Sequence, residues 1–560
     1  MLCHMTPATS ASTSAAATTA PRPRRLPLTG VLRLGRPADI WFKPALSVVA
    51  SVAPPNLTLL ALGRLDLAMY TMAGSLCALY AHNRPYGARG RVLARVILAM
   101  VGGLGVCLVT ASLTGNAVVL VTVGALLAAL HKALCDATRV GPPGNVVLTF
   151  ITSASLFAPQ TLGQVPGHLA LAAAAGVWSW LVGMAPGLLR PHGPERRATA
   201  GALNATAAYA ANGTEDGRSR AAAAAAVQAA WHSLLAAGDS RTRRGLERLV
   251  VRAEVALAAP ADADPKQLRT WARRLTTAGP VPEVHDPEAA GELLGVDAEL
   301  AVPAAPLRAR LGPLAPIAVR TALGCALAGY ASLALGIGRP YWALVTAASL
   351  YQANLALTWT RGVQRVVGNL LGVLLFAAVV PLAHLGPAAL VLCCLAFNFG
   401  AEALIGRNYW LGTVCVTPMA LLITEFTGFQ QPGLLITERA VDTVVGALVG
   451  FLAAVAVTNR RAGDRVEHAL AAAERAREHA ARLLAESAPA PAAVHSARRA
   501  LAAALAELRA TVDAASGEWW QRALPQERVV RAEQAGHRTL AATVRQQGRY
   551  RSGETEGVRP

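Results

Sequence analysis

Charged residues are scarce in this sequence. They make up 15% of its 560 residues, whereas 54% of the residues are hydrophobic. A soluble protein of this length would cover its surface with far more polar side chains. The composition therefore excludes an ordinary soluble domain, and it favours a chain whose main solvent is the lipid bilayer.

Acidic residues are rarer than basic ones. The chain has 33 Asp and Glu residues against 52 Lys and Arg, which gives a net charge of +19. In a soluble protein such an excess would suggest nucleic acid as a partner. Here many of the arginines lie in the tails and in short loops between apolar segments, the pattern that orients membrane proteins with basic loops inside the cell. We expect the lipid bilayer as a partner and no nucleic acid.

Signatures of catalysis and of cofactor binding are missing. The eight cysteines occur singly or as one adjacent pair, with neither metal-ligand spacing nor a disulfide framework. The chain has no phosphate-binding loop, no cluster of metal-binding histidines and no nucleophile elbow. We therefore expect no enzymatic activity, no metal, no cofactor and no pump driven by ATP.

The apolar residues gather in two blocks, and Gly, Pro and charged residues divide each block into six segments. The predicted spans cover about 41–62, 66–81, 92–112, 116–133, 144–160 and 168–189, then 314–336, 341–357, 363–383, 387–404, 409–425 and 434–457. Pro54 and Pro55 predict a break or kink inside the first span. In the first block basic residues occupy every second loop, which predicts an N-terminus inside the cell. The sequence thus predicts an all-α polytopic membrane protein of about 12 spans.

The two blocks also share a pattern. A Gly-Arg pair precedes a span at Gly63 and again at Gly338, and the pattern Arg-x-x-x-Arg-Val begins at Arg91 and again at Arg361. The basic turns of both blocks fall on the same side. This predicts two tandem six-helix units, related as a parallel repeat about an axis along the membrane normal.

The composition divides the chain into five regions. These are a disordered basic tail over 1–38, a first transmembrane unit over 39–189, an Ala-rich cytoplasmic helical insert and linker over 190–305, a second transmembrane unit over 306–458, and a cytoplasmic helical region over 459–560. The last region is expected to form an antiparallel hairpin. Both termini are expected in the cytoplasm, and the chain in the cytoplasmic membrane.

Basic and aromatic residues near the ends of the spans are the candidate substrate-binding residues. They are Arg64, Arg339, Trp342, Arg361 and Arg365. Arg64 and Arg339 are expected on the outer side, where lone positive charge is disfavoured, so binding of a carboxylate by the guanidinium fork would explain them. The alternative is an arginine that snorkels at a helix end. Trp342 belongs either to an interfacial aromatic belt or to a stacking contact with an aromatic substrate.

Acidic residues at membrane depth are the candidates for proton coupling. They are Glu402, Glu438 and Asp442. For Glu402 a structural ion pair with Lys132, at the equivalent place in the repeat, is the favoured alternative. For Glu438 and Asp442, one helical turn apart, the favoured alternative is a local network with Arg439.

Glycines spaced four residues apart predict close helix packing. Gly368 and Gly372 lie on one face of a span, and Gly446 and Gly450 lie on one face of another. These four residues carry no information about a substrate.

The second block resembles the fusaric acid resistance-like family of inner-membrane proteins, which includes aromatic acid exporters. The motifs are Pro340-Tyr341-Trp342-Ala343, the segment RGVQRVVGNLLG over 361–372, Thr417-Pro418, and Glu438-Arg439 followed by Asp442-Thr443 and Gly446. The resemblance is specific over about 310–457. One departure is Gly368-Asn369, where the family usually has Gly-Thr.

The resemblance implies proton-driven export of aromatic carboxylic acids or related organic anions. The fold is also similar to that of plant malate-type anion channels, so a passive organic-anion channel is the second hypothesis. The third is a non-transporting membrane scaffold whose cytoplasmic helices bind partners. The glycine patterns and the family analogy also suggest a homodimer.

Overall fold

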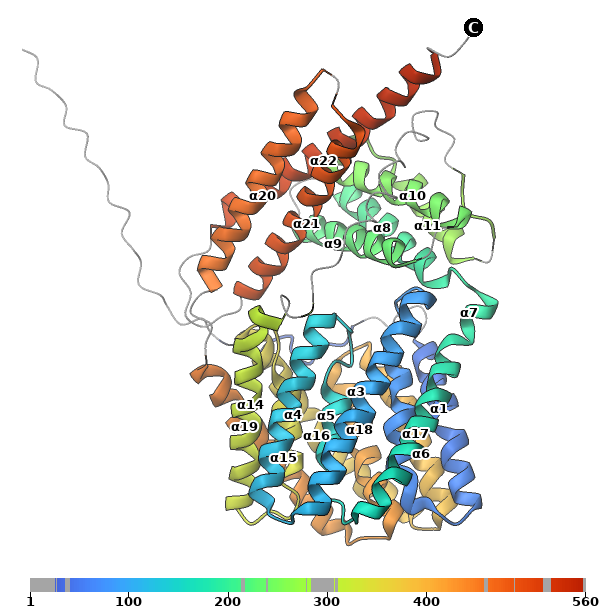
Figure 1. Ribbon diagram of the computed structural model, residues 1–560, viewed down its shortest axis with the longest axis vertical. Helices are drawn as coiled ribbons and strands as arrows, with labels where there is room; N and C mark the ends of the chain where they lie inside the picture. Colours follow the sequence, from blue (N-terminus) through green and yellow to red (C-terminus); the bar gives the residue numbers. More distant parts are fainter. Residues whose placement is uncertain are drawn as a thin grey trace, which may run out of the picture.

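The computed structural model describes residues 26, 28–35, 41–212, 217–237, 240–277, 279–283, 307, 311–457, 462–487, 489–516 and 525–556. Within this part of the chain every regular element is a helix. A bundle of apolar helices forms one body, and a set of amphipathic helices covers one end of it (Figure 1). We call this set, α8–α11 and α20–α22, the polar layer. An all-α polytopic membrane protein is thus confirmed.

The first unit of the bundle holds the helices from α1 to α7. They are α1 (Phe42–Ala61), α2 (Ala68–Ser75), α3 (Tyr86–Leu113), α4 (Ala117–Thr138), α5 (Val146–Ser155), α6 (Val165–Met184) and α7 (Pro186–Leu189). The short 3₁₀ segments η1 (Leu65–Leu67), η2 (Leu76–Leu79) and η3 (Leu162–Gln164) extend α2 and α6. Asn116 starts α4, because its side chain accepts a hydrogen bond from the backbone amide of Val118 at 3.0 Å. The helix α1 continues through Pro54 and Pro55, so the predicted break is absent.

The second unit of the bundle holds the helices from α14 to α19. It contains α14 (Ala315–Ala334), α15 (Tyr341–Leu350), α16 (Leu355–Ala383), α17 (Pro387–Ile405), α18 (Tyr409–Thr424), η7 (Glu425–Thr427) and α19 (Pro432–Ala456). Asn354 and Asn408 cap α16 and α18, and prolines stand in the first turns of α14, α17 and α19.

Nine helices of the described residues are long and apolar enough to cross a membrane. Three further apolar helices, Leu65–Leu79, Val146–Ser155 and Tyr341–Leu350, are shorter. After two of them the chain leaves the helix in extended conformation, at Tyr80 and at Tyr351. The hydroxyls of these tyrosines donate hydrogen bonds to the backbone carbonyls of Gly144 (2.7 Å) and Gly450 (3.1 Å). Broken helices of this kind are tolerated where protein or a cavity surrounds them. Of the about 12 predicted spans, nine correspond to these long helices, and the spans at 66–81, 144–160 and 341–357 correspond to the three shorter ones.

The predicted turn that carries Arg361 and Arg365 is instead helix. Because Asn354 caps α16, the helix starts eight residues earlier than the expected span at 363. Arg361 and Arg365 consequently lie on one face of α16, one turn apart.

The polar layer is built from the insert and the C-terminal region. The insert contributes α8 (Gly193–Asn212), α9 (Gly217–Ala236), α10 (Arg241–Ala258) and α11 (Pro265–Thr276). The C-terminal region contributes α20 (Ala462–Ala485), α21 (Pro491–Ala515) and α22 (Gln526–Glu556), three mutually packed helices where a hairpin of two was expected. An ion pair between Arg220 and Glu533, 3.0 Å apart and buried, joins the two parts.

The polar layer also contacts the bundle. The side-chain amide of Asn354 donates to the carbonyl of Asp513 in α21 at 3.1 Å. The described stretch 28–35 of the predicted basic tail lies against the turn before α18, where Asn408 donates to the carbonyls of Val31 and Arg33. Apart from residue 26, the other residues of that tail lie outside the described residues.

Packing partners follow the same scheme in both units. In the first unit α2 packs on α6, α3 on α5 and α6, and α4 on α5; in the second unit α15 packs on α19, α16 on α18 and α19, and α17 on α18. The largest contacts between the units are those of α4 with α14 and of α17 with α1, and α15 also packs on α4 and α5.

Candidate functional site

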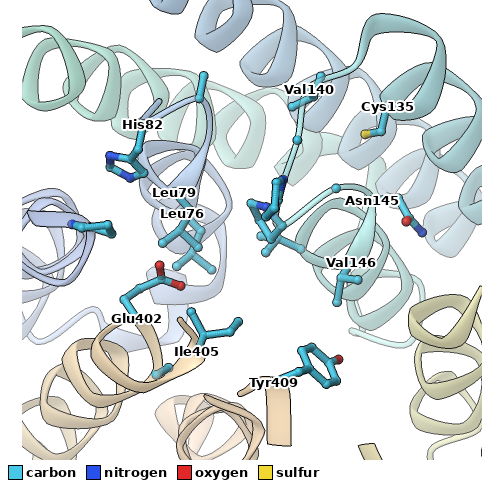
Figure 2. A pocket seen from close by; sticks show the side chains of 18 of the residues that line it. Leu76, Leu79, His82, Cys135, Val140, Asn145, Val146, Glu402, Ile405 and Tyr409 are labelled. Carbon is cyan, nitrogen blue, oxygen red and sulfur yellow. The ribbon is translucent and has the colours of Figure 1, made fainter. Parts of the chain in front are cut away.

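A pocket of about 1740 Å³ lies between the two units. Its walls come from the breaks after η2 and α15 and from the turns before α5 and α18. In Figure 2, Leu76, Leu79 and His82 are on one side of the pocket and Val140 and Val146 are on the other. Arg197 of α8 and Arg465 of α20 also line it, so it reaches the end of the bundle that the polar layer covers.

The lining of the pocket is strongly basic. Ten arginines and two lysines line it, whereas its acidic lining residues, among those described, are Asp136 and Glu402. Lys132 and Asp136 form an ion pair at 3.0 Å within α4, which neutralises one residue of each sign. A cleft lined by one sign of charge between low-dielectric walls concentrates ions of the opposite sign. The pocket is therefore suited to an anion.

Arg439 of α19 is the most deeply buried cation that lines the pocket, with 1% of its surface exposed. Its guanidinium carbon lies 4.1 Å from the ring centroid of Trp342, and the Trp342 ring stacks on Phe150 with centroids 5.5 Å apart. Nε and Nη1 of Arg439 have no hydrogen-bond partner among the described residues. A buried cation whose donors are unpaired destabilises the folded protein unless an anion neutralises its charge and accepts its hydrogen bonds.

Asn369 stands beside this cation and joins three helices. Its side-chain nitrogen donates to the Thr443 hydroxyl of α19 at 2.9 Å, and its oxygen accepts from the Thr417 hydroxyl of α18 at 2.6 Å. The same oxygen is 3.5 Å from Nη2 of Arg439. The departure from the usual family motif is thus a buried, hydrogen-bonded residue next to the pocket.

Two further arginines line the pocket on α16. Arg365, with 3% of its surface exposed, donates from Nη1 to the Tyr409 hydroxyl at 3.1 Å, and its Nε has no partner in the part of the chain that the structure describes. The guanidinium of Arg361 lies 3.8 Å from the centroid of the Tyr409 ring. Tyr409 therefore fixes both cations from the start of α18.

Glu402 lines the pocket from α17, and Figure 2 shows its carboxylate pointing into the pocket. The expected ion pair of Glu402 with Lys132 is not formed, because Lys132 pairs with Asp136.

The expected network of Glu438, Arg439 and Asp442 is also not formed. Glu438 pairs with Arg339, at 2.5 Å. Asp442 is fully buried and accepts a hydrogen bond from the Ser332 hydroxyl of α14 at 2.6 Å, while its Oδ2 has no partner among the described residues. The three side chains point to three different neighbours.

Of the five predicted substrate-binding residues, Arg361 and Arg365 line the pocket and Trp342 lies directly beneath Arg439. Arg339 pairs with Glu438 and also donates to Gln430. Arg64 is exposed and pairs with Asp66 at 3.1 Å. Neither Arg64 nor Arg339 lines the pocket. Sequence reasoning missed Arg439 as a pocket residue, although a cation inside the predicted span over 434–457 was the available signal.

The four predicted packing glycines lie at helix contacts. A Cβ on Gly368 or Gly372 would come within 2.6 Å of an atom of α18, and one on Gly446 would come within 2.5 Å of the Ala343 carbonyl of α15. At Gly450 the nearest atoms would be those of Ala347, at 3.1 Å. Close approach of α16 to α18 and of α15 to α19 shapes the deep wall of the pocket.

Comparison with known proteins finds relatives of the second unit. Residues 326–453 match the family model described as fusaric acid resistance protein-like. A curated relative, the uncharacterized membrane protein YvaC of Bacillus subtilis (strain 168), is 31% identical over 137 residues, which is 24% of this chain and 22% of the relative. The match thus spans about a fifth of that relative's length. No solved structure gives a significant match. The segment that forms most of α14–α19 is therefore similar to the fusaric acid resistance protein-like family, as its motifs predicted.

Proposed function

We propose that this chain is a secondary transporter that exports organic anions, with aromatic carboxylates as the leading substrates and the proton gradient as the driving force. The observation that carries the proposal is the basic pocket with Arg439 at its deep wall, fully buried and with two guanidinium nitrogens that have no hydrogen-bond partner among the described residues. A carboxylate offers two oxygens that match the guanidinium fork, and it would neutralise the cation. In this proposal the chain binds and moves its ligand without chemical conversion.

Aromatic side chains next to the cations support an aromatic acid. Phe150 and Tyr409 line the pocket, and Trp342 supports Arg439 from below. Aromatic rings attract each other in offset-stacked or edge-to-face geometry. Such a pair contributes about 0.5–1.5 kcal/mol in addition to the free energy gained by burying the two rings. A benzoate-like molecule could place its carboxylate at Arg439 and its ring at Phe150.

The paired arrangement of the helices supports alternating access. We interpret the shared order of helices and the matching contacts as a tandem repeat of two six-helix units, with the pocket between them. In such transporters one unit rocks against the other around a central site. The pocket reaches the polar layer, so we interpret the present state as open to the cytoplasm, with both termini on that side.

Two acids are candidates for proton coupling. Glu402 lines the pocket. Asp442 lies three residues after Arg439 on α19, and one of its carboxylate oxygens has no partner within the described ranges. Protonation of either acid would change the net charge beside the bound anion. Acids at membrane depth commonly serve such proton relays.

The test is transport by the purified protein in proteoliposomes with an imposed pH gradient. Arg439→Gln and Arg365→Gln each remove a charged donor, which contributes about 1.5–3 kcal/mol. We expect the KM for benzoate and p-hydroxybenzoate to rise about 10- to 100-fold in both variants. The matched control is Arg95→Gln, the repeat counterpart of Arg365, because Arg95 is exposed and lies outside the pocket lining.

The alternatives give different results in the same assay. Flux that is saturable, needs Arg439 and ignores the pH gradient would support the passive channel. Absence of flux for every acid of the panel would contradict transport and favour the scaffold. Equal KM values in Arg439→Gln and wild type would contradict the proposal that the substrate binds in this pocket.

A further inference from the structure

A second basic cluster lies in the first unit, at the junction of α1, α3 and α8. Lys43, Arg89 and Arg197 line the same pocket near the polar layer, and their charges are close enough to repel one another. Arg89 is 4% exposed and packs beside Gly183 of α6. The cluster comes from elements of the first unit and the insert, whereas Arg361, Arg365 and Arg439 come from the second unit.

Two arginines of the cluster have hydrogen-bond donors without a partner among the described residues. Nε of Arg89 and Nη1 of Arg197 are buried and have no hydrogen-bond partner among the described residues. Nη2 of Arg89 donates to Nδ1 of His82 at 3.0 Å. Burial, and then the charge of Arg89, lowers the pKa of His82 to about 3, so the imidazole is neutral and accepts this bond without balancing the charge.

The acid near the cluster is Glu195 of α8, which is 3% exposed and lies 3.9 Å from His192. Of the three cations Glu195 acts on Arg197, and exposed Arg190 adds a fourth cation that acts on Lys43 and Arg197. The excess of positive charge predicts an anionic ligand. The guanidinium groups of Arg89 in α3 and Arg197 in α8 can donate to several oxygens of one phosphate.

The pocket beside this cluster continues as an apolar groove along α1 and α6. Leu46, Ala50, Trp178 and Val182 line it, and Leu46 (55% exposed) and Trp178 (39% exposed) are on the outer surface of the bundle. Trp178 crosses between the helices, because its indole nitrogen donates to the Ala50 carbonyl at 3.1 Å. Figure 1 shows α1, α6 and α7 together at one edge of the bundle, beneath the insert.

The short helix α7 shows where this end of the groove lies relative to the lipid headgroups. Leu188 and Leu189 are 89% and 87% exposed, and Arg190 follows them directly. Exposed leucines next to a basic residue are typical of a segment at the boundary of acyl chains and headgroups. The basic cluster therefore lies at headgroup depth, and the groove runs from it into the acyl region.

We propose that one anionic phospholipid binds here, with its phosphate at Lys43, Arg89 and Arg197 and an acyl chain in the groove between α1 and α6. Basic pockets at the headgroup level bind acidic lipid headgroups in other membrane proteins. A soluble anion would leave the apolar groove unused, whereas a lipid fills both parts. The bound lipid would also tie α8 of the insert to the bundle beside the mouth of the pocket.

The test uses the full chain purified in a neutral detergent. Thermal unfolding is followed with added phosphatidylglycerol, with phosphatidylcholine and with glycerol phosphate, and native mass spectrometry counts the retained lipid. We expect phosphatidylglycerol to stabilise the wild type most and to be retained about one per chain. Arg89→Gln and Arg197→Gln should each weaken its retention at least about tenfold, since each loses a charge-assisted bond.

Two further variants make the result decisive. Arg91→Gln, on α3 but exposed and outside the pocket lining, should retain phosphatidylglycerol like the wild type. Ala50→Phe fills the groove without touching a charge, so it should also lose the lipid. Equal retention in Arg89→Gln, Arg197→Gln and wild type would overturn the proposal, and so would equal stabilisation by glycerol phosphate and phosphatidylglycerol. Because these readouts need no transport, they are independent of the exporter hypothesis.

Discussion

Asp442 has one carboxylate oxygen that accepts a bond from Ser332 and one that has no partner among the described residues. If Asp442 carries the coupled proton, Asp442→Asn keeps a bond acceptor for Ser332 and removes the charge that titrates. We expect this variant to retain exchange of substrate across the membrane and to lose accumulation driven by a pH gradient. Counterflow and gradient-driven uptake in the same proteoliposomes measure the two separately.

Ser332→Ala is the control for the position, since it removes the bond and leaves the carboxyl group. It should retain gradient-driven transport with a shifted pH profile. Parallel loss of counterflow and gradient-driven uptake in Asp442→Asn would mean that the residue supports only the packing of α14 against α19. An unchanged response to the gradient would place the coupled proton elsewhere, with Glu402 as the next candidate.

Sequence reasoning at the level of single residues identified the right residue types but assigned several to the wrong partners. In a helix each residue turns by about 100°, so Glu438 and Asp442 share a face, and Asp442 also lies only about 60° from Arg439. Adjacent residues do not face each other, so the spacing argued against contact of Glu438 with Arg439 but not of Arg439 with Asp442. It could not reveal that Arg439 meets Trp342, because that contact joins α19 to α15 across about a hundred residues of sequence.

At the level of helices, the glycine contacts give a prediction. A Cβ at Gly446 would lie 2.5 Å from the Ala343 carbonyl, and that backbone oxygen has no room to move without shifting α15. We expect Gly446→Ala to destabilise the protein by ~1–3 kcal/mol, as overpacking does. The measurement is the midpoint of thermal unfolding of the detergent-purified chain.

Gly433→Ala, in the first turn of the same helix, provides the comparison. A Cβ there meets nothing within 4 Å, so this substitution should be neutral or slightly stabilising. If Gly446→Ala unfolds at the same temperature as Gly433→Ala, then α19 and α15 are farther apart than described.

The existence of the helices could be predicted from hydropathy, whereas their ends often could not. The expected spans at 92–112 and 363–383 miss the first turns of α3 and α16, because basic residues in those turns were interpreted as loops. The break after α15 escaped prediction, because the expected span over 341–357 runs through it, whereas the expected span over 66–81 ends close to the break after η2. The hydropathy of a short stretch of sequence does not show that the chain leaves the helix there to line a cavity.

For the whole molecule, the pattern of contacts between the units could not be obtained from the sequence. The repeated motifs indicated two similar units, but only the packing reveals that α4 meets α14 and α17 meets α1. These two contacts flank the pocket, so any rocking of one unit against the other must change them. The polar layer adds a further tie, through Asn354 and the Asp513 carbonyl.

The contact between α4 and α14 offers a direct test of such motion. A Cβ on Gly329 would lie 3.5 Å from Cβ of Val121, within the separation of about 3.5–4.5 Å that a disulfide needs. In Gly329→Cys alone the new side chain would meet Cγ1 of Val121 at 2.6 Å from its Cβ, and Val121→Cys removes that obstruction. The double variant should therefore cross-link under mild oxidation. The cysteines of the described residues are all buried, which limits competing pairs.

The cross-link is detected after a protease site inserted in the Pro-rich stretch 280–306 is cut. The two halves of the double variant should stay joined on a non-reducing gel and separate with reductant, while each single variant separates in both. If transport requires the units to move against each other, oxidation should abolish most of the flux and reductant should restore it. A complete cross-link with unchanged flux would contradict rocking at this interface, and the fixed passage of an anion channel would then be the better account of the pocket.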